Sequence, residues 1–459
     1  MSSVHMANGF DPDSSPDLSP EATDLLRRRS QVLSSSYRLF YSEPVDVVCG
    51  QGSHLFDAAG NDYLDVYNNV PGIGHSHPRV TEYVSAQLAT LNTHTRYLTE
   101  AVVSYSEDLL ATFPTALDRI TYACSGSEAI DLAVRLARFA TGHRGVIVTA
   151  NAYHGTTELS AGLSPSLGEN NPLGPDVVTV EAPDGFRDDP ATASAEFAAR
   201  IRTAAEDLEE RGIGLAAVLV DSVLSSDGVQ PEPAGFLAEA ATVAHEFCGL
   251  WIADEVQPGF GRTGTMWGFE RHTGTRGGTQ PGPELPGLEA PIPDIAVLGK
   301  PMGNGMPISA VVTRAELGEE FGRRVRYFNT FGGNPVSIAA ARAVLEVVRE
   351  EDLPGHASTT GAALAQGLSD LAQDFFLLGQ VRQAGLFLGV EVVDPEAPRA
   401  ADQARASAVV NGLRNRRVLI SASGPHANVL KVRPPLVFGA ADTDRFLTSL
   451  ADTLASLRA

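Results

Sequence analysis

The chain has 459 residues, 43% hydrophobic and 20% charged, which is ordinary usage for a soluble globular protein. Its formal net charge of −22 argues against a nucleic-acid partner, because only residues 27–29 form a basic cluster. Three scattered cysteines do not suit a disulfide framework or a zinc site. No apolar run reaches the roughly 18 residues of a membrane span, and the first residues lack the features of a signal peptide. We therefore expect a cytoplasmic protein that acts away from membranes.

The N-terminal part of the chain changes character twice. Residues 1–24 are rich in Ser, Asp and Pro and are expected to form a disordered tail. Strands are predicted over 45–48, 53–58 and 63–66, separated by turn residues. We expect residues 25–74 to be the N-terminal part of a small domain.

From about His75 onward, short apolar runs alternate with helical stretches. The apolar runs are residues 120–123, 146–149, 177–180, 216–220, 250–253, 295–298 and 308–312, and the helical stretches include 128–140, 195–210 and 236–247. Most of the runs are rich in Val, Ile and Leu without alternation, which is typical of strands buried on both faces. The pattern predicts an α/β fold, with a mostly parallel sheet wound by helices over residues 75–335.

The C-terminal part, residues 336–459, opens with a helix predicted over 336–350 and continues with strands such as 386–393 and 429–432. We expect it to form a small α+β domain together with the N-terminal strands. A Gly- and Pro-rich insert at 272–293 is expected to be a surface loop on the large domain, with gating of the site as the alternative.

Lys300 and Asp254 are the first candidates for catalysis, because each follows a probable buried strand. In an open α/β sheet the carboxyl ends of the strands face the ligand crevice. A desolvated lysine there loses its proton readily and can capture a carbonyl group. An aspartate opposite a pyridinium nitrogen is what a pyridoxal phosphate site needs. The pair predicts a Schiff-base enzyme.

Three further segments could contact such a cofactor, and each has a plainer interpretation. Residues 125–127 join a strand to a helix start, where free N–H groups and the helix dipole attract anions, but they could equally be a simple helix cap. The turn at 330–335 offers a hydroxyl to a phosphate, or is only a loop turn. Tyr153 could stack on a heteroaromatic ring or lie at the edge of the core.

Residues 259–264 match the G-x-G-x-x-G fingerprint of dinucleotide-binding proteins. No clear helix follows the match, and no ribose-binding acid stands at the expected distance. A loop with tight glycine turns explains the match better than a nicotinamide site does.

Several segments together resemble class III (omega-type) pyridoxal-phosphate aminotransferases. They are ADEVQPGFGRTG at 253–264, GKPMGNG at 299–305, TFGGNP at 330–335, SGSEA at 125–129, AYHG at 152–155 and GHSHP at 74–78. The resemblance extends from about Tyr37 to the C-terminus. It implies the fold type I architecture, pyridoxal 5'-phosphate as cofactor, and a homodimer with active sites at the subunit interface.

The resemblance also implies roles for individual residues. Lys300 would form the Schiff base, and Asp254 would keep the pyridine nitrogen protonated. Tyr153 would stack on the ring, with His154 as a further cofactor contact, and Gln257 would contact the 3-oxygen. The phosphate would be held by Ser125, Gly126 and Ser127, and by Thr330 of the neighbouring subunit.

Arg433 falls where the family binds a substrate carboxylate, a task that suits the guanidinium fork. Members that use ω-amines often mask this arginine with a glutamate, but Ser226 stands at that position here, which argues against an ornithine- or 4-aminobutyrate-type substrate. Residues 68–70, 91–98 and 327–330 are similar to a branch that includes phospho-lyases, where Arg96 could bind an anionic group of the substrate.

The expected activity is transfer of an amino group from a small amine or amino acid to a keto acid or aldehyde. The alternative is a phospho-lyase that eliminates phosphate from a phosphorylated amino alcohol or hydroxylated amino acid. Both reactions begin with the same proton removal, so the motifs for the cofactor do not choose between them.

Overall fold

The computed structural model describes residues 8–14, 17–273 and 291–457. Its largest element is a seven-stranded sheet of order β4-β10-β9-β8-β7-β5-β6. The strands are β4 (Arg119–Ala123), β5 (Gly145–Thr149), β6 (Val177–Val180), β7 (Leu215–Asp221), β8 (Leu250–Asp254), β9 (Ile295–Leu298) and β10 (Ser309–Thr313). All seven coincide with the predicted apolar runs to within one residue at each end.

The sheet is mostly parallel, as predicted, with β10 as the exception. β10 runs antiparallel to both of its neighbours, β4 and β9, whereas the remaining neighbours pair in parallel. Only ten residues separate the end of β9 from the start of β10, and this stretch holds no helix that could carry the chain back across the sheet. A parallel pair requires such a crossover, so the short connection explains the reversal.

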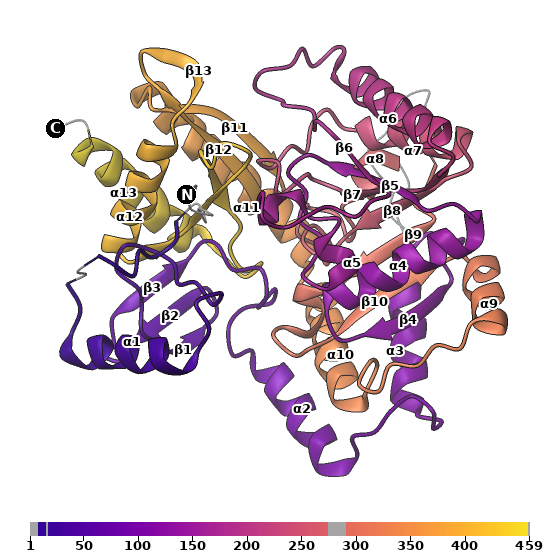
Figure 1. Ribbon diagram of the computed structural model, residues 1–459. Helices are drawn as coiled ribbons and strands as arrows, with labels where there is room; N and C mark the ends of the chain where they lie inside the picture. The colour runs from indigo at the N-terminus through magenta and orange to yellow at the C-terminus, as the bar shows by residue number, and fades with distance from the viewer. Residues whose placement is uncertain (1–7, 15–16, 274–290, 458–459) are drawn as a thin grey trace.

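Helices cover both faces of this sheet (Figure 1). Ala217 and Leu219 of β7 pack in one core cluster with residues of α4 (Gly126–Thr141). The alternating Val218 and Val220 pack in another cluster with residues of α6 (Ala193–Glu210) and α7 (Phe236–Glu246). Burial on both faces is the physical reason why these strands are apolar at every position.

The small domain combines both ends of the chain. One sheet has the order β1-β2-β3-β14, and its strands are β1 (Val47–Gln51), β2 (His54–Asp57), β3 (Asp62–Asp65) and β14 (Val418–Leu419). β14 pairs in parallel with β3 and so joins the C-terminal part of the chain to the N-terminal strands. A second sheet has the order β11-β12-β16-β15, and β13 pairs with β12 beside this path. Its strands are β11 (Leu378–Ala384), β12 (Phe387–Asp394), β13 (Ala397–Ala401), β15 (Ser421–Ser423) and β16 (Val429–Val432). Helices α11 (Leu353–Asp374), α12 (Gln403–Asn415) and α13 (Ala440–Ser456) pack around these sheets.

Two boundaries differ from those expected. Helix α1 (Pro20–Val32) begins inside the predicted tail of residues 1–24, because Ser19 caps it and Pro20 is preorganised for its first turn. Helix α10 (Pro335–Glu350) packs against α2 (Pro78–Thr90) and α3 (Glu100–Leu110) of the large domain, so residue 336 does not open the small domain. An amphipathic helix shows in sequence that it has a partner, but not which one.

Two remaining segments need only brief mention. The predicted loop at 272–293 lies mostly outside the described residues. The glycine-rich turn at 259–264 connects the domains, since Arg262 donates to the carbonyl of Leu386 (3.0 Å) and Leu386 N–H donates back to the carbonyl of Arg262 (3.0 Å). Among the described residues no helix is both long and apolar enough to cross a bilayer.

Candidate active site

Lys300 and Asp254 lie at the same edge of the large sheet. Strand β8 ends on Asp254, which is in register with Val297 of β9, and Lys300 follows two residues after β9 ends. Lys300 begins the short turn η2 (Lys300–Gly303) with a φ of +29°, outside the regions that L-residues favour. Such a conformation persists only where the surroundings impose it, and it is common at functional sites.

A cavity of about 140 Å³ lies against these two side chains. Its lining is Gly126, Ser127, Tyr153, His154, Gly155, Asp254, Val256, Gln257 and Lys300. Segments more than a hundred residues apart in the sequence thus meet in one place. Seven of the eleven predicted site residues line this cavity.

A buried histidine orients the carboxylate of Asp254. His154 Nδ1 lies 2.7 Å from Asp254 Oδ2, and Asp254 Oδ1 accepts the N–H of Val256 at 3.0 Å. The other ring nitrogen of His154, Nε2, is buried without a hydrogen-bond partner in the described part of the chain. A buried polar atom normally has a partner, so this atom indicates room for a polar group at the cavity.

The other end of the cavity is the N-terminus of α4. Ser125 caps the helix by accepting the N–H of Glu128, whereas the N–H groups of Gly126 and Ser127 have no hydrogen-bond acceptor among the described residues. The hydroxyl of Ser127 accepts from Thr156 N–H at 3.0 Å and so keeps its own proton available for donation. These donors and the helix dipole form an anion site.

Gly155 leaves space for that anion site. Its φ is +145°, and a Cβ at this position would lie 2.5 Å from the hydroxyls of Ser127 and Ser160. Only glycine therefore allows the chain to pass this close to the helix start. The donors, the glycine cradle and the open nitrogen of His154 fit a phosphate-bearing pyridine cofactor.

Arg433 and Gln257 contact each other directly at the border of the cavity. Gln257 lines the cavity, and its Oε1 accepts from Arg433 Nη1. Arg433 Nε also donates to the carbonyl of Tyr67 at 3.2 Å. The predicted contact of Gln257 with the 3-oxygen and the predicted carboxylate site at Arg433 thus belong to one hydrogen-bonded group.

Thr330 and Arg96 lie outside the cavity of this subunit. Both are exposed, and the guanidinium of Arg96 lies 3.7 Å from the ring centroid of Phe328, on the same turn as Thr330. The turn is tied to α4 because Asn329 Nδ2 donates to Glu128 Oε2 at 3.2 Å. Thr330 was expected to act on the neighbouring subunit, and its exposure allows this.

The sequence prediction did not include two charged groups near the site, one half-buried and one buried. Asp221 ends β7 in register with Asp254, and Lys431 lies in β16 of the small domain. The charge of Asp221 acts on the pKa of Lys300, and the charge of Lys300 acts on that of Lys431. A third apolar run ending on an acid was the available signal for Asp221.

The surroundings of Lys300 lower the pKa of its side-chain amine. Desolvation lowers the pKa of its amine, the nearby charge of Arg433 lowers it further, and the carboxylates of Asp254 and Asp221 oppose the shift. A lysine whose pKa is lowered spends more time as the neutral amine, which is the form that acts as nucleophile and base.

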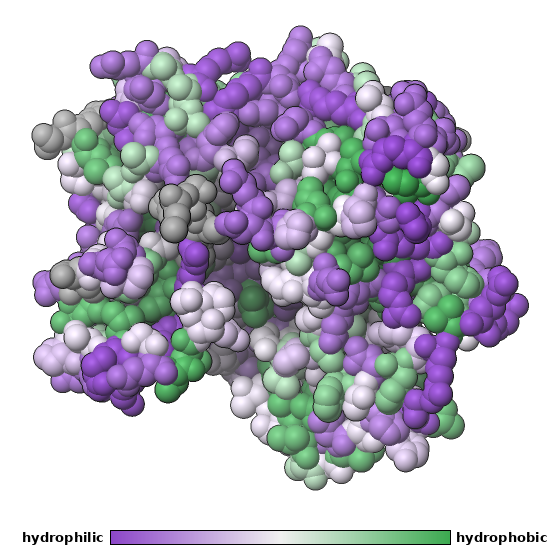
Figure 2. Space-filling view, in the orientation of Figure 1, coloured by the Kyte–Doolittle hydropathy of each residue, from purple (hydrophilic) through white to green (hydrophobic). Residues whose placement is uncertain are grey.

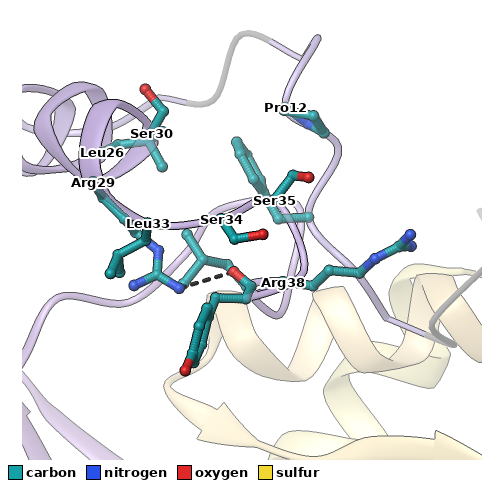
Figure 3. A pocket seen from close by; sticks show the side chains of 11 residues that line it. Pro12, Leu26, Arg29, Ser30, Leu33, Ser34, Ser35 and Arg38 are labelled. Atoms are coloured by element: carbon teal, nitrogen blue, oxygen red, sulfur yellow. Dashed lines mark hydrogen bonds between the residues drawn. The ribbon is translucent and has the colours of Figure 1, made fainter.

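A second cavity, about 380 Å³, is remote from Lys300 in the sequence and shares no lining residue with the site. It lies between α1 and residues 33–39, where Arg29 Nη2 donates to the carbonyl of Tyr37 at 2.9 Å (Figure 3). Its walls offer neither a lysine nor a carboxylate, so we do not assign the chemistry to it.

Residues 40–454 match the aminotransferase class-III family. The chain belongs to this family, and it is a pyridoxal-phosphate-dependent enzyme of fold type I that acts on small molecules.

Three relatives illustrate the range of activities in this family. The chain is 35% identical to "Ethanolamine-phosphate phospho-lyase homolog 1" of Caenorhabditis elegans, over 99% of both chains. It is 38% identical to "Alanine--glyoxylate aminotransferase 2-like" of Drosophila melanogaster, over 95% of this chain and 87% of the relative. A phospholyase from Arthrobacter, solved in complex with phosphoethanolamine, superposes with a TM-score of 0.87 at 42% identity and covers 94% of this chain and 100% of its own.

Proposed function

We propose that this protein is a phospho-lyase, which eliminates phosphate from a phosphorylated amino alcohol of the phosphoethanolamine type. The observation that carries the proposal is the 42% identity to a phospholyase solved with phosphoethanolamine. Arg433 adds support, because in the described residues its hydrogen-bond partners are Gln257 and the carbonyl of Tyr67, and it forms no ion pair within 4.0 Å that would occupy its charge.

The arrangement of side chains suits this reaction. Bound pyridoxal phosphate supplies an electron sink for the carbon that bears the amine. Lys300, as the neutral amine, would remove the proton from that carbon, and Asp254, held by His154, would stabilise positive charge on the ring nitrogen of the cofactor. The bond between the neighbouring carbon and the phosphate oxygen then breaks, and its electron pair leaves with phosphate. Phosphoethanolamine and water would give acetaldehyde, ammonia and inorganic phosphate.

Transamination is the second candidate, because the Drosophila relative carries that name and the same proton removal begins both reactions. The two differ in what happens next: elimination needs no acceptor, whereas transamination stops unless a keto acid or aldehyde accepts the amino group. The demand for a co-substrate therefore separates them.

We expect the cofactor-loaded enzyme to release phosphate and ammonia steadily from phosphoethanolamine with no keto acid present. The measurement follows phosphate, ammonia and aldehyde together, with Lys300→Ala as the blank. Addition of pyruvate or glyoxylate should leave the rate unchanged. Absence of phosphate, together with amino transfer once the keto acid is added, would overturn elimination in favour of transamination.

We also propose that the enzyme is a homodimer whose subunits complete each other's sites. Large apolar side chains are exposed beside Arg96 and Thr330, including Tyr97 (65% exposed) and Phe331 (69%). Figure 2 shows hydrophobic residues over α2, where Leu88 and Leu91 are also exposed. An apolar surface of this kind marks an interaction site. We expect sedimentation equilibrium to give twice the chain mass of 48.4 kDa. Leu98→Arg should shift the measured mass toward that of the monomer. A wild-type enzyme that is active as a monomer would refute the proposal.

The cytoplasmic location stays a prediction.

A further inference from the structure

The turn that carries Lys300 has an unusual backbone at both of its ends. Lys300 begins η2 with a φ of +29°, and Asn304 ends it with a φ of +47° and a ψ of +42°. Asparagine adopts the left-handed conformation more readily than most residues, whereas lysine does so only where its surroundings impose it. The turn therefore needs contacts that hold it in place.

The side-chain amide of Asn304 supplies two such contacts. Its Oδ1 accepts the N–H of Ile73 at 3.1 Å, and its Nδ2 donates to the carbonyl of Gly74 at 2.9 Å, about 230 residues away in the sequence. An asparagine that only ended a turn would need neither bond, since glycine would serve there as well. These two hydrogen bonds, which we call the Asn304 clamp, fix the end of the turn to residues 72–74.

Close packing acts at the beginning of the same turn. Gly72 lies against Pro301, and a Cβ at position 72 would lie 2.8 Å from the Cβ of Pro301. The backbone of Gly72 is not left-handed, so glycine is required here by lack of space rather than by conformation. Pro301 follows Lys300 directly. The packing contact and the Asn304 clamp therefore hold the turn from both ends.

Residues 72–74 are themselves held by the small domain. The carbonyl of Gly72 accepts the N–H of Leu436 at 2.8 Å. His75, the next residue in the chain, exchanges backbone hydrogen bonds of 2.8 Å and 3.2 Å with Gly52. The support of the lysine turn is thus anchored on both sides, and it joins Lys300 of the large domain to the small domain.

We propose that Asn304 is a positioning residue for Lys300, which holds the lysine turn in place for attack on the aldehyde carbon of pyridoxal phosphate. In this step the amine nitrogen forms the C=N bond and the aldehyde oxygen leaves as water. Asn304 does not line the cavity of Lys300, so it acts through the backbone of the turn. A displacement of about 1 Å at a reacting group can lower a rate by about 10²-fold. The inference rests on the role of Lys300 in the proposed function, but not on whether elimination or transamination follows.

The test follows formation of the Schiff base on the full-length chain freed of cofactor and mixed rapidly with pyridoxal phosphate. Visible absorbance at increasing concentrations gives two quantities. The maximal rate constant reports the attack by Lys300, and the half-saturating concentration reports how well the phosphate is held. Lysine occurs only at positions 300 and 431, so few other side-chain amines can contribute to the signal.

Three variants are compared with wild type. Asn304→Gly removes the clamp and keeps the left-handed turn. Gly72→Ala leaves the amide intact and presses on Pro301 from the other side. Asn411→Ala is the matched control, because Asn411 also joins distant segments without lining the cavity: its Oδ1 accepts the N–H of Ser42 at 2.8 Å.

We expect the maximal rate constant to fall by about 10- to 100-fold in Asn304→Gly and in Gly72→Ala. The half-saturating concentration should stay close to that of wild type, because the donors at the start of α4 are untouched. In the loaded enzyme kcat should fall by more than KM rises. Asn411→Ala should lower the melting temperature and leave the rate constant unchanged.

An unchanged rate constant in Asn304→Gly, or an equal fall in Asn411→Ala, would overturn the inference and leave Asn304 as a structural cap. If one of the two turn variants does not fold, the other decides. If neither folds, the contact serves the fold as a whole, and a role confined to the lysine turn is overturned as well.

Failure of the inference can be told from failure of the proposed function. Schiff-base absorbance that still forms in Lys300→Ala would refute the role of Lys300 itself. Slow Schiff-base formation in Asn304→Gly, without phosphate release by wild type, would keep the clamp and refute elimination. Phosphate release by wild type, with an unchanged rate constant in Asn304→Gly, would keep elimination and refute the clamp.

Discussion

Replacement of Lys300 by alanine is expected to lower turnover by at least about 10³-fold, because it removes both the amine that holds the cofactor and the base that moves the proton. Steady-state phosphate release measures the fall in turnover. The visible absorbance of the cofactor bound as a Schiff base measures the loss of the amine and should disappear. The cavity should otherwise persist, since the neighbouring segments are held by their own hydrogen bonds, such as Asp254 Oδ1 with Val256 N–H.

Lys300→Arg is the matched control, because it keeps a positive charge at the strand end but has no nucleophilic amine. It should be as inactive as Lys300→Ala. Borohydride reduction of the wild type should fix the cofactor to one lysine only, and peptide mass mapping should find it on Lys300 and not on Lys431. Turnover that survives in Lys300→Ala would refute the assignment.

Asp254→Asn is expected to lower turnover by about 10²- to 10³-fold while the protein stays folded. Asparagine keeps the size of the side chain, and its amide oxygen can still accept the N–H of Val256 while its NH2 group faces Nδ1 of His154. It lacks the negative charge that holds a pyridine nitrogen protonated, so the electron sink weakens. The measurement is kcat at saturating cofactor, with the absorbance maximum of the bound cofactor as a second readout.

Glu391→Gln is the comparison for Asp254→Asn. Glu391 is also a buried carboxylate, but its partners are Arg382 and Arg187 in ion pairs far along the chain from β8. Its loss should lower the melting temperature and leave kcat of the folded enzyme close to wild type. If Asp254→Asn behaved in the same way, its role would be structural.

The strands of the large domain could be predicted closely because burial on both faces makes each an uninterrupted apolar run. The direction of β10 could not, since nothing within the strand itself records the short connection before it. Helix α10 shows the same limit: its amphipathic pattern predicts a buried face, but the choice between two domains depends on packing that only the folded chain reveals.

For the site, residues at strand ends were predictable because parallel strands bring their carboxyl ends together. The sequence interpretation therefore placed Lys300, Asp254 and Tyr153 at one edge. The bond between His154 and Asp254 joins residues one hundred positions apart, and the contact between Arg433 and Gln257 crosses between domains. Such side-chain pairings have no periodic signal in the sequence. The roles of Thr330 and Arg96 depend on a second subunit and stay predictions.

The distribution of lysine has a practical consequence. Arginine carries the positive charge everywhere except at Lys300, which is half-buried in the wall of the cavity, and Lys431, which is buried. Reagents that acylate primary amines would find no lysine on the surface of this protein. Coupling to a support or a dye through amine-reactive esters would therefore be confined to the chain's terminal amine. Once the cofactor occupies Lys300, such bioconjugation should spare the enzyme's activity.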